Sequence, residues 1–180
     1  MPYQEMFNSY YGGSMNSIVF QEIREARALA YSAYSYVSQP QRKGESDYIM
    51  AYVGTQSDKM VSAMDAFKEL LTNMPGSEKA FDISKEMVLN NMRSERITKS
   101  NIFWTYKSLQ DLGIDYDYRK PVFETIQKLT LSDVQNYFDN HIKPANYSVI
   151  LVGNKNKVDF KYLNKIATVK EISLEELFGY

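Results

Sequence analysis

The hydrophobic period of the chain changes at Tyr31, and this change constrains the fold more than any other feature of the sequence. Before it, apolar residues recur at helical spacing, whereas residues 31–37, YSAYSYV, alternate small and aromatic side chains. Residues 48–55, YIMAYVGT, are also rich in strand-forming residues, and the polar loop QPQRKGESD separates the two stretches. The sequence therefore predicts two antiparallel strands joined by a hairpin loop.

Helical spacing of apolar residues flanks this predicted hairpin on both sides. A short helix over residues 3–11 is expected to end at Gly12-Gly13, where left-handed backbone angles cost least. Ser14 is the expected N-cap of a second helix, whose apolar face holds Met15, Ile18, Val19 and Ile23. After the hairpin, the sequence predicts further helices over residues 57–71, 77–96, 101–112, 122–129, 130–142 and 159–166.

The last third of the chain contains another strong strand signal. Residues 147–153, YSVILVG, predict a buried strand, and residues 169–173 predict a last extended piece. Antiparallel strands separated from a block of helices indicate an α+β fold, in which a two-layer, mostly antiparallel sheet packs against the helices. A chain of 180 residues is long enough for one domain and short for two, so we expect residues 1–180 to form a single domain.

Composition excludes several classes of function. The chain has 21 basic and 22 acidic residues and a net charge of -1, so we expect no basic face for nucleic acid. No apolar run approaches the roughly 20 residues that span a bilayer, so no membrane span is expected. Met1 opens directly onto a helical pattern with no preceding strand, which suggests a cut from a longer chain.

The sequence lacks the ligands of a catalytic zinc site. It has one histidine, His141, and no cysteine. Zinc-peptidase motifs of the zincin and inverzincin types need two histidines about one helical turn apart, together with a glutamate. His141 is therefore predicted to lie at a helix C-terminus, near the negative end of the helix dipole, and no metal ligand is predicted in this chain.

Three other motifs are incomplete. Gly12-Gly13-Ser14 precedes a helix, but no Gly-Lys-Ser or Gly-Lys-Thr follows, so a hinge is expected there rather than a phosphate-binding loop. No Gly-x-Ser-x-Gly motif precedes His141, so a serine triad is not expected. Asp115 and Asp117 do not begin a calcium loop, because Lys120 and Ile126 occupy the positions that need glycine and glutamate.

Arg24 and Tyr31 form the candidate functional pair. They lie seven residues apart, so their side chains can share one helix face, or converge from a helix end and a strand start. A guanidinium and a phenol aimed at one point can hold a peptide carbonyl, and hold it more strongly once it carries the charge of a tetrahedral intermediate. The structural alternative is an exposed arginine paired with Glu22 or Glu25 and a tyrosine packed on its strand neighbour. Spacing alone favours that alternative.

Longer stretches of the sequence resemble the C-terminal, non-zinc lobe of insulinase/pitrilysin-type zinc metallopeptidases, the inverzincins. The resemblance begins with GGSMNSIVFQEIREARALAYSAYS at residues 12–35. It continues with YVGTQSDKMVSAM after the hairpin, LTLSDVQNYFDNHIKPANYSVILVGN, and the closing SLEELFGY. These segments cover nearly the whole chain in the order of the family, whose subunits are two related α+β halves enclosing a chamber.

The resemblance implies roles for residues of this chain. In the family, the N-terminal half carries the zinc motif, and the C-terminal half supplies an arginine and a tyrosine that reach the substrate peptide. By position these correspond to Arg24 and Tyr31. Ala28 stands where many relatives have glycine, and the strand that usually precedes the first helix is missing. The resemblance therefore implies a metalloendopeptidase lobe that binds a peptide or protein substrate, holds no cofactor, and cleaves nothing in isolation.

Zinc is then expected in an N-terminal half of the same polypeptide or in a partner subunit. A second hypothesis is a catalytically inactive relative that binds peptides or scaffolds a complex. The absence of cysteine leaves the compartment open, and a periplasmic or otherwise extracytoplasmic location is slightly favoured over a cytoplasmic one.

Overall fold

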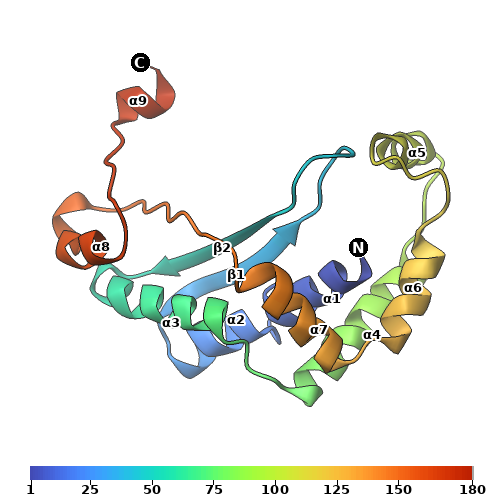
Figure 1. Ribbon diagram of the computed structural model, residues 1–180, viewed down its shortest axis with the longest axis horizontal. Helices are drawn as coiled ribbons and strands as arrows, with labels where there is room; N and C mark the ends of the chain where they lie inside the picture. The colour runs from blue at the N-terminus through green and yellow to red at the C-terminus, as the bar shows by residue number, and fades with distance from the viewer. Residues whose placement is uncertain (180) are drawn as a thin grey trace.

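A computed structural model describes residues 1–179 of the chain as a mixed α+β structure, mostly helical, whose described part contains one two-stranded antiparallel sheet (Figure 1). The elements, in chain order, are α1 (Pro2–Tyr11), α2 (Ile18–Phe20), the π-helix η1 (Gln21–Ala26), β1 (Ala30–Ser38), β2 (Tyr48–Thr55), the 3-10 turn η2 (Ser57–Lys59), α3 (Met60–Thr72), α4 (Glu78–Ser94), α5 (Ile102–Asp111), α6 (Arg119–Lys128), α7 (Leu131–Tyr137), the π-helix η3 (Phe138–Ile142), the 3-10 turn η4 (Lys155–Lys157), α8 (Phe160–Ile166) and α9 (Leu174–Phe178). No helix of residues 1–179 is long and apolar enough to cross a membrane.

The predicted hairpin is confirmed. Strands β1 and β2 pair antiparallel, with Tyr34 opposite Tyr52 and Tyr36 opposite Met50. The register shifts between Ala30 and Ser32, which marks a bulge at the start of β1. Beyond the bulge, one side of β1 is buried through Ala33, Ser35 and Val37.

Helix α1 lies along the edge of β1 that faces away from β2. The Asn8 side-chain amide donates to the Val37 carbonyl oxygen at 2.9 Å, and the Val37 N–H donates to the Asn8 Oδ1 at 2.7 Å. The Ser35 N–H donates to the Gly12 carbonyl oxygen at 3.2 Å. Helix α1 thus supplies hydrogen-bond partners that a neighbouring strand would otherwise provide.

The predicted reason for glycine at position 12 is wrong. Gly12 has a φ of -143°, so it does not adopt the left-handed conformation. A Cβ atom at this position would lie 2.2 Å from the Ser35 carbonyl oxygen. Glycine is needed there because two backbones meet at van der Waals contact, not because the chain must turn.

The core forms around α1. Phe7 and Tyr11 are fully buried and stack with ring centroids 4.8 Å apart, and both also contact the ring of Phe138 beyond α7. The Tyr10 hydroxyl donates to the Pro75 carbonyl oxygen and accepts from the Ser77 N–H, each at 2.9 Å. These contacts hold the α3–α4 connection and η3 against α1, which lies next to α4 and α7 (Figure 1).

The helix after α1 begins later than predicted. It starts at Ile18, not after Ser14, because the Ser17 hydroxyl donates to the Ser14 carbonyl oxygen at 2.6 Å and stabilises a separate turn. Met15 therefore lies outside the helix and is 72% exposed. Ile18, Val19 and Ile23 are buried, as the predicted apolar face requires.

The helices after the hairpin match their predictions closely. Ser77 caps α4 by accepting from the Ala80 N–H at 3.3 Å. Thr130 and Asp133 form a reciprocal capping box at the start of α7, with the Thr130 N–H donating to the Asp133 carboxylate at 2.8 Å. Helix α6 begins at Arg119, three residues before the predicted start.

The predicted buried strand at residues 147–153 is wrong. This segment pairs with no strand among the described residues, and Ile150 and Val152 are 90% and 94% exposed. Helix α1 already occupies part of the outer edge of β1, and no other strand of residues 1–179 lies beside the segment to satisfy its backbone. The predicted extended piece at 169–173 is likewise unpaired, and α9 follows it without having been predicted.

Candidate functional site

Arg24 and Tyr31 come together, although they belong to different elements. Arg24 lies in η1, and Tyr31 is the second residue of β1. The Arg24 Cζ lies 5.0 Å from the centroid of the Tyr31 ring and 4.8 Å from that of Phe20, so two aromatic rings flank the guanidinium. Of the two predicted arrangements, the structure shows convergence from a helix end and a strand start.

The backbone between the two residues turns where the π-helix η1 ends and β1 begins. The π-helix ends as the Ala28 N–H donates to the Arg24 carbonyl oxygen at 3.1 Å, and the Leu29 N–H donates to the Ile23 carbonyl oxygen at 2.9 Å. Ala28 has a φ of +47°, in the left-handed region that favours glycine. The turn therefore needs the conformation that glycine adopts most readily, although alanine occupies the position.

Side chains from the end of β2, from η2 and from α3 hold this turn in place. The Lys59 ammonium donates to the Ala28 carbonyl oxygen at 2.9 Å, and the Thr55 hydroxyl donates to the Leu29 carbonyl oxygen at 2.6 Å. Arg27 forms an ion pair with Glu69 of α3 at 2.8 Å, which raises the pKa of Arg27 and lowers the pKa of Glu69. Arg27 is thus engaged in structure, whereas Arg24 is directed toward Tyr31.

The bulge at the start of β1 determines where Tyr31 points. Residues of a regular strand alternate between its two faces, so Tyr31 would share the buried face of Ala33 and Ser35. The register shift between Ala30 and Ser32 moves Tyr31 to the open face instead, where it is 84% exposed. Its hydroxyl has no hydrogen-bond partner within residues 1–179, so it is available to a ligand.

The structural alternative for Arg24 is present as well. The Arg24 Nε lies 3.6 Å from the Glu25 carboxylate, and both side chains are substantially exposed. Surface ion pairs of this kind contribute about 0–1 kcal/mol, so the contact leaves the guanidinium free to exchange partners. The geometry therefore combines an ion pair with two cation–π contacts.

Other candidate residues are accounted for by ordinary contacts. His141 lies in η3 with its ring 4.8 Å from that of Tyr137. Asp117 pairs with the Arg119 guanidinium, which lowers the pKa of the Asp117 carboxyl to about 2. Within residues 1–179, no three His, Asp or Glu side chains gather in a way that could hold a metal ion, so the residues present do not fit a catalytic zinc.

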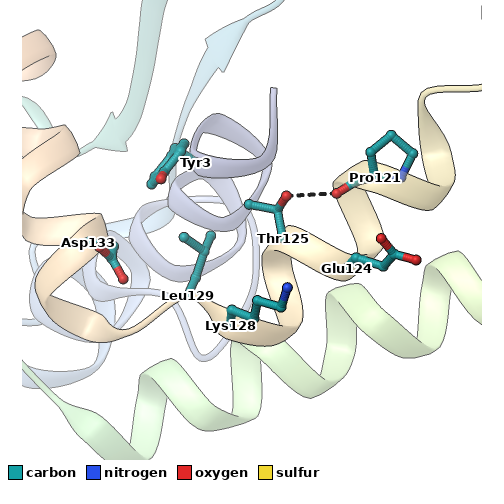
Figure 2. A pocket seen from close by; sticks show the side chains of 7 residues that line it. All are labelled: Tyr3, Pro121, Glu124, Thr125, Lys128, Leu129 and Asp133. Carbon is teal, nitrogen blue, oxygen red and sulfur yellow. Dashed lines mark hydrogen bonds between the residues drawn. The ribbon is translucent and has the colours of Figure 1, made fainter.

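Two shallow depressions lie away from the Arg24–Tyr31 pair. One, of about 310 Å³, is shown in Figure 2, where the Thr125 hydroxyl donates to the Pro121 carbonyl oxygen at 2.7 Å. Its walls come from the start of α1, from α6 and from α7, and are formed by Tyr3, Pro121, Glu124, Thr125, Lys128, Leu129 and Asp133. The other, of about 390 Å³, lies between α4 and α6. Neither includes a residue of the candidate pair.

Sequence analysis missed Phe20 as a neighbour of the pair. Phe20 precedes Arg24 by four residues, a spacing that places two side chains on one helix face, so the signal was present. The π-helix and the bulge carry no comparable signal, because the turn between them is held by Thr55 of β2, Lys59 of η2 and Glu69 of α3, which lie far along the sequence.

Comparisons with known proteins agree with this fold. Residues 4–88 match the family described as the peptidase M16 inactive domain. The uncharacterized zinc protease YmxG of Bacillus subtilis is 31% identical over 90 residues, which cover 48% of this chain and 21% of that protein. The non-peptidase homolog YmxG of Helicobacter pylori is 25% identical over 150 residues, which cover 81% of this chain and 34% of that protein.

A solved structure shares the architecture. The crystal structure of the peptidase M16 inactive domain from Pseudomonas fluorescens superposes with a TM-score of 0.61 at 21% identity, over 78% of this chain and 34% of that one. The chain spans about a fifth to a third of the length of the two curated relatives described above. Residues 4–88 are thus similar to the peptidase M16 inactive domain, the C-terminal domain of insulinase-family zinc protease homologues, as are the related sequences, and the solved structure shows the same fold.

Proposed function

We propose that this chain is the substrate-binding, non-zinc lobe of an insulinase-family zinc metalloendopeptidase. Arg24 and Tyr31 contact the substrate peptide and its tetrahedral intermediate. The observation that carries the proposal is the convergence of the Arg24 guanidinium and the exposed Tyr31 ring at 5.0 Å. The relative from B. subtilis that is named a zinc protease supports the proteolytic context.

The chemistry of the pair suits a reacting carbonyl. A guanidinium offers several N–H donors in a fixed plane, and a phenol offers one more from another direction. Donors held in advance of the reaction stabilise the negative charge that develops on a carbonyl oxygen more than they stabilise the neutral carbonyl. Phe20 and Tyr31 restrict the orientation of the Arg24 guanidinium, which reduces the cost of ordering it around substrate.

The remaining chemistry belongs to another lobe. The zinc ion, its bound water and the general base are supplied by a zinc-bearing half, in the same polypeptide or in a partner subunit. No cleavage step is assigned to the residues of this chain, and the isolated chain is expected to hold no stoichiometric zinc. Metal analysis showing one tightly bound zinc per chain would contradict this assignment.

A second candidate function is a non-catalytic subunit that binds peptides or scaffolds a complex. The relative from H. pylori is named a non-peptidase homolog, and its match extends over most of this chain. The Arg24–Glu25 ion pair is compatible with such a role, because it gives Arg24 a structural contact without substrate.

The deciding experiment reconstitutes this lobe with its zinc-bearing half and follows cleavage of a fluorogenic peptide. Arg24→Ala and Tyr31→Phe are expected to lower kcat/KM by ~10- to ~1000-fold each, as loss of an oxyanion donor does. Arg42→Ala, in the exposed hairpin loop, and Tyr116→Phe are the matched controls and should leave turnover unchanged. Unchanged rates for both site variants, or peptide binding without turnover by the wild type, would favour the non-catalytic subunit.

A further inference from the structure

The open side of the hairpin carries a group of exposed tyrosine and methionine side chains. We name it the tyrosine face, and it consists of Tyr31, Tyr34 and Tyr36 of β1 with Met50 and Tyr52 of β2. We propose that the tyrosine face binds an extended, uncharged segment of the substrate that carries aromatic or proline rings. This inference rests on the proposed function, because it extends the Arg24–Tyr31 site along the hairpin.

Cross-strand pairing assembles the tyrosine face. Tyr34 lies opposite Tyr52, with ring centroids 5.3 Å apart and planes inclined by only 21°. The Tyr36 ring follows at 6.4 Å from Tyr34, and the Tyr36 hydroxyl lies 3.3 Å from the Met50 sulfur. Tyr34 and Tyr52 nevertheless remain 40% and 49% exposed. The rings restrain one another while their outer surfaces stay open to a ligand.

The bulge makes the face continuous with the candidate site. Without the register shift, Tyr31 would point to the buried side of β1, and the aromatic group would end at Tyr34. With it, Tyr31 joins the exposed side and contacts Arg24, so the guanidinium lies at one end of the face. A peptide carbonyl held by Arg24 would therefore have its neighbouring residues directed toward the tyrosine rings.

The composition of the face indicates which side chains it accepts. Every residue on this side of the two strands is tyrosine, serine, methionine or glycine, without a single charged side chain. Away from Arg24, a charged ligand residue would lose water over these strands without gaining an opposite charge. Aromatic and proline rings instead gain edge and face contacts with tyrosine, and an extended chain matches the rise of the strands below it.

The preformed state of the face favours binding of a flexible peptide. Its rings lie on a paired hairpin, and β1 is further held by Asn8 of α1 and by Gly12, which follows α1. Tyrosine side chains have few rotatable bonds, so ordering them costs little compared with ordering long charged side chains. The alternative occupants, a second copy of the chain and its own exposed segment 147–153, are distinguished by the experiment below.

The test measures binding of two labelled peptides to the 180-residue chain by fluorescence anisotropy. One peptide alternates phenylalanine and proline with glycine and serine, and the matched peptide alternates glutamate and lysine at the same positions with no net charge. The double variant Tyr34→Thr with Tyr52→Thr, which keeps strand propensity, is expected to weaken binding of the first peptide by about 10-fold. Tyr116→Thr, which removes a more exposed tyrosine elsewhere, should not change it.

Two further measurements test whether the double variant is folded and whether the peptide contacts the tyrosine face of the wild type. Circular dichroism establishes that the double variant is folded, and ring-proton shifts in the wild type report contact at the tyrosine face without any mutation. Equal binding of the charged peptide, or unchanged binding by the folded double variant, would overturn the inference. It would also be overturned if the wild type sediments as a dimer that the double variant abolishes, or if deletion of 147–153 increases ligand access to the face.

The same variants separate this inference from the proposed function. If the double variant binds normally while Arg24→Ala loses turnover in the reconstituted enzyme, the tyrosine face is not a binding surface and the proposed function stands. If the double variant loses binding while Arg24→Ala and Tyr31→Phe turn over normally, the face binds peptide and the role proposed for the pair is wrong.

Discussion

Residues 30–38 and 147–153 have similar strand-forming compositions, but only the first stretch becomes a strand. β1 buries Ala33 and Val37 against the helices, each at 5% exposure. In the second stretch, Ile150 and Val152 are almost fully exposed, and the trace in Figure 1 runs between α7 and α8 without an arrow. Amino-acid composition alone therefore does not determine which of the two stretches forms a strand.

The difference lies in what each backbone can bond to. β1 has β2 on one edge, and on the other it meets the Asn8 side chain and the Gly12 carbonyl. Residues 147–153 have no ladder partner among the described residues, so their backbone must bond to water. A strand-forming sequence thus becomes a strand only where a neighbouring backbone, or side chains in its place, can hydrogen-bond to it.

The largest expected effect tests the contact that replaces a neighbouring strand. Gly12→Ala places a Cβ 2.2 Å from the Ser35 carbonyl oxygen, so α1 must move away from β1. We expect a loss of about 3 kcal/mol or more in the free energy of unfolding, measured by urea denaturation. Gly153→Ala is the matched control, because nothing lies within 4 Å of a Cβ there, and it should change stability by less than about 0.5 kcal/mol. Equal losses of stability for the two variants would mean that the backbone at Gly12 is packed no more closely than the backbone at Gly153.

A second pair of variants compares the same substitution in the two stretches. Val37→Ser removes a buried side chain and leaves a hydroxyl in the core, with an expected loss of about 2 kcal/mol. Val152→Ser alters a side chain that is already in water, so a change within about 0.5 kcal/mol is expected. Thermal denaturation of both variants gives the comparison directly. A large loss for Val152→Ser would mean that residues 147–153 are buried in solution.

Much of the fold followed from local patterns. The hairpin and the helix starts near residues 77 and 130 depend on residues close in sequence, and all three were predicted. The start of the second helix and the state of residues 147–153 were not, because they depend on a competing turn at Ser17 and on the absence of a strand neighbour within the described chain.

In the candidate site, too, nearby residues predicted some features and distant contacts determined others. The convergence of Arg24 and Tyr31 was one of two arrangements that their spacing allows. It depends on a π-helix, a left-handed Ala28 and a bulge, in a segment that β2, η2 and α3 contact. The residue types could be proposed from sequence, whereas the direction of the Tyr31 side chain required the register of the hairpin.

The smallest expected effect concerns the turn that leads into β1. Ala28 adopts a φ of +47°, where an alanine Cβ crowds the following carbonyl, while its turn is held by Lys59 and Thr55. Ala28→Gly is expected to raise the free energy of unfolding by about 1 kcal/mol, because the relieved strain exceeds the extra entropy of an unfolded glycine. Ala51→Gly, in the regular part of β2, should instead lower it by about 0.5–1 kcal/mol.

Opposite signs for these two substitutions would show that the start of β1 is strained and that contacts made elsewhere overcome the strain. If Ala28→Gly destabilised the protein as much as Ala51→Gly, the turn would not be left-handed in solution. β1 would then form because the conformation at its start is locally favourable, whereas in the present structure β2 and α1 hold the strand against a local cost.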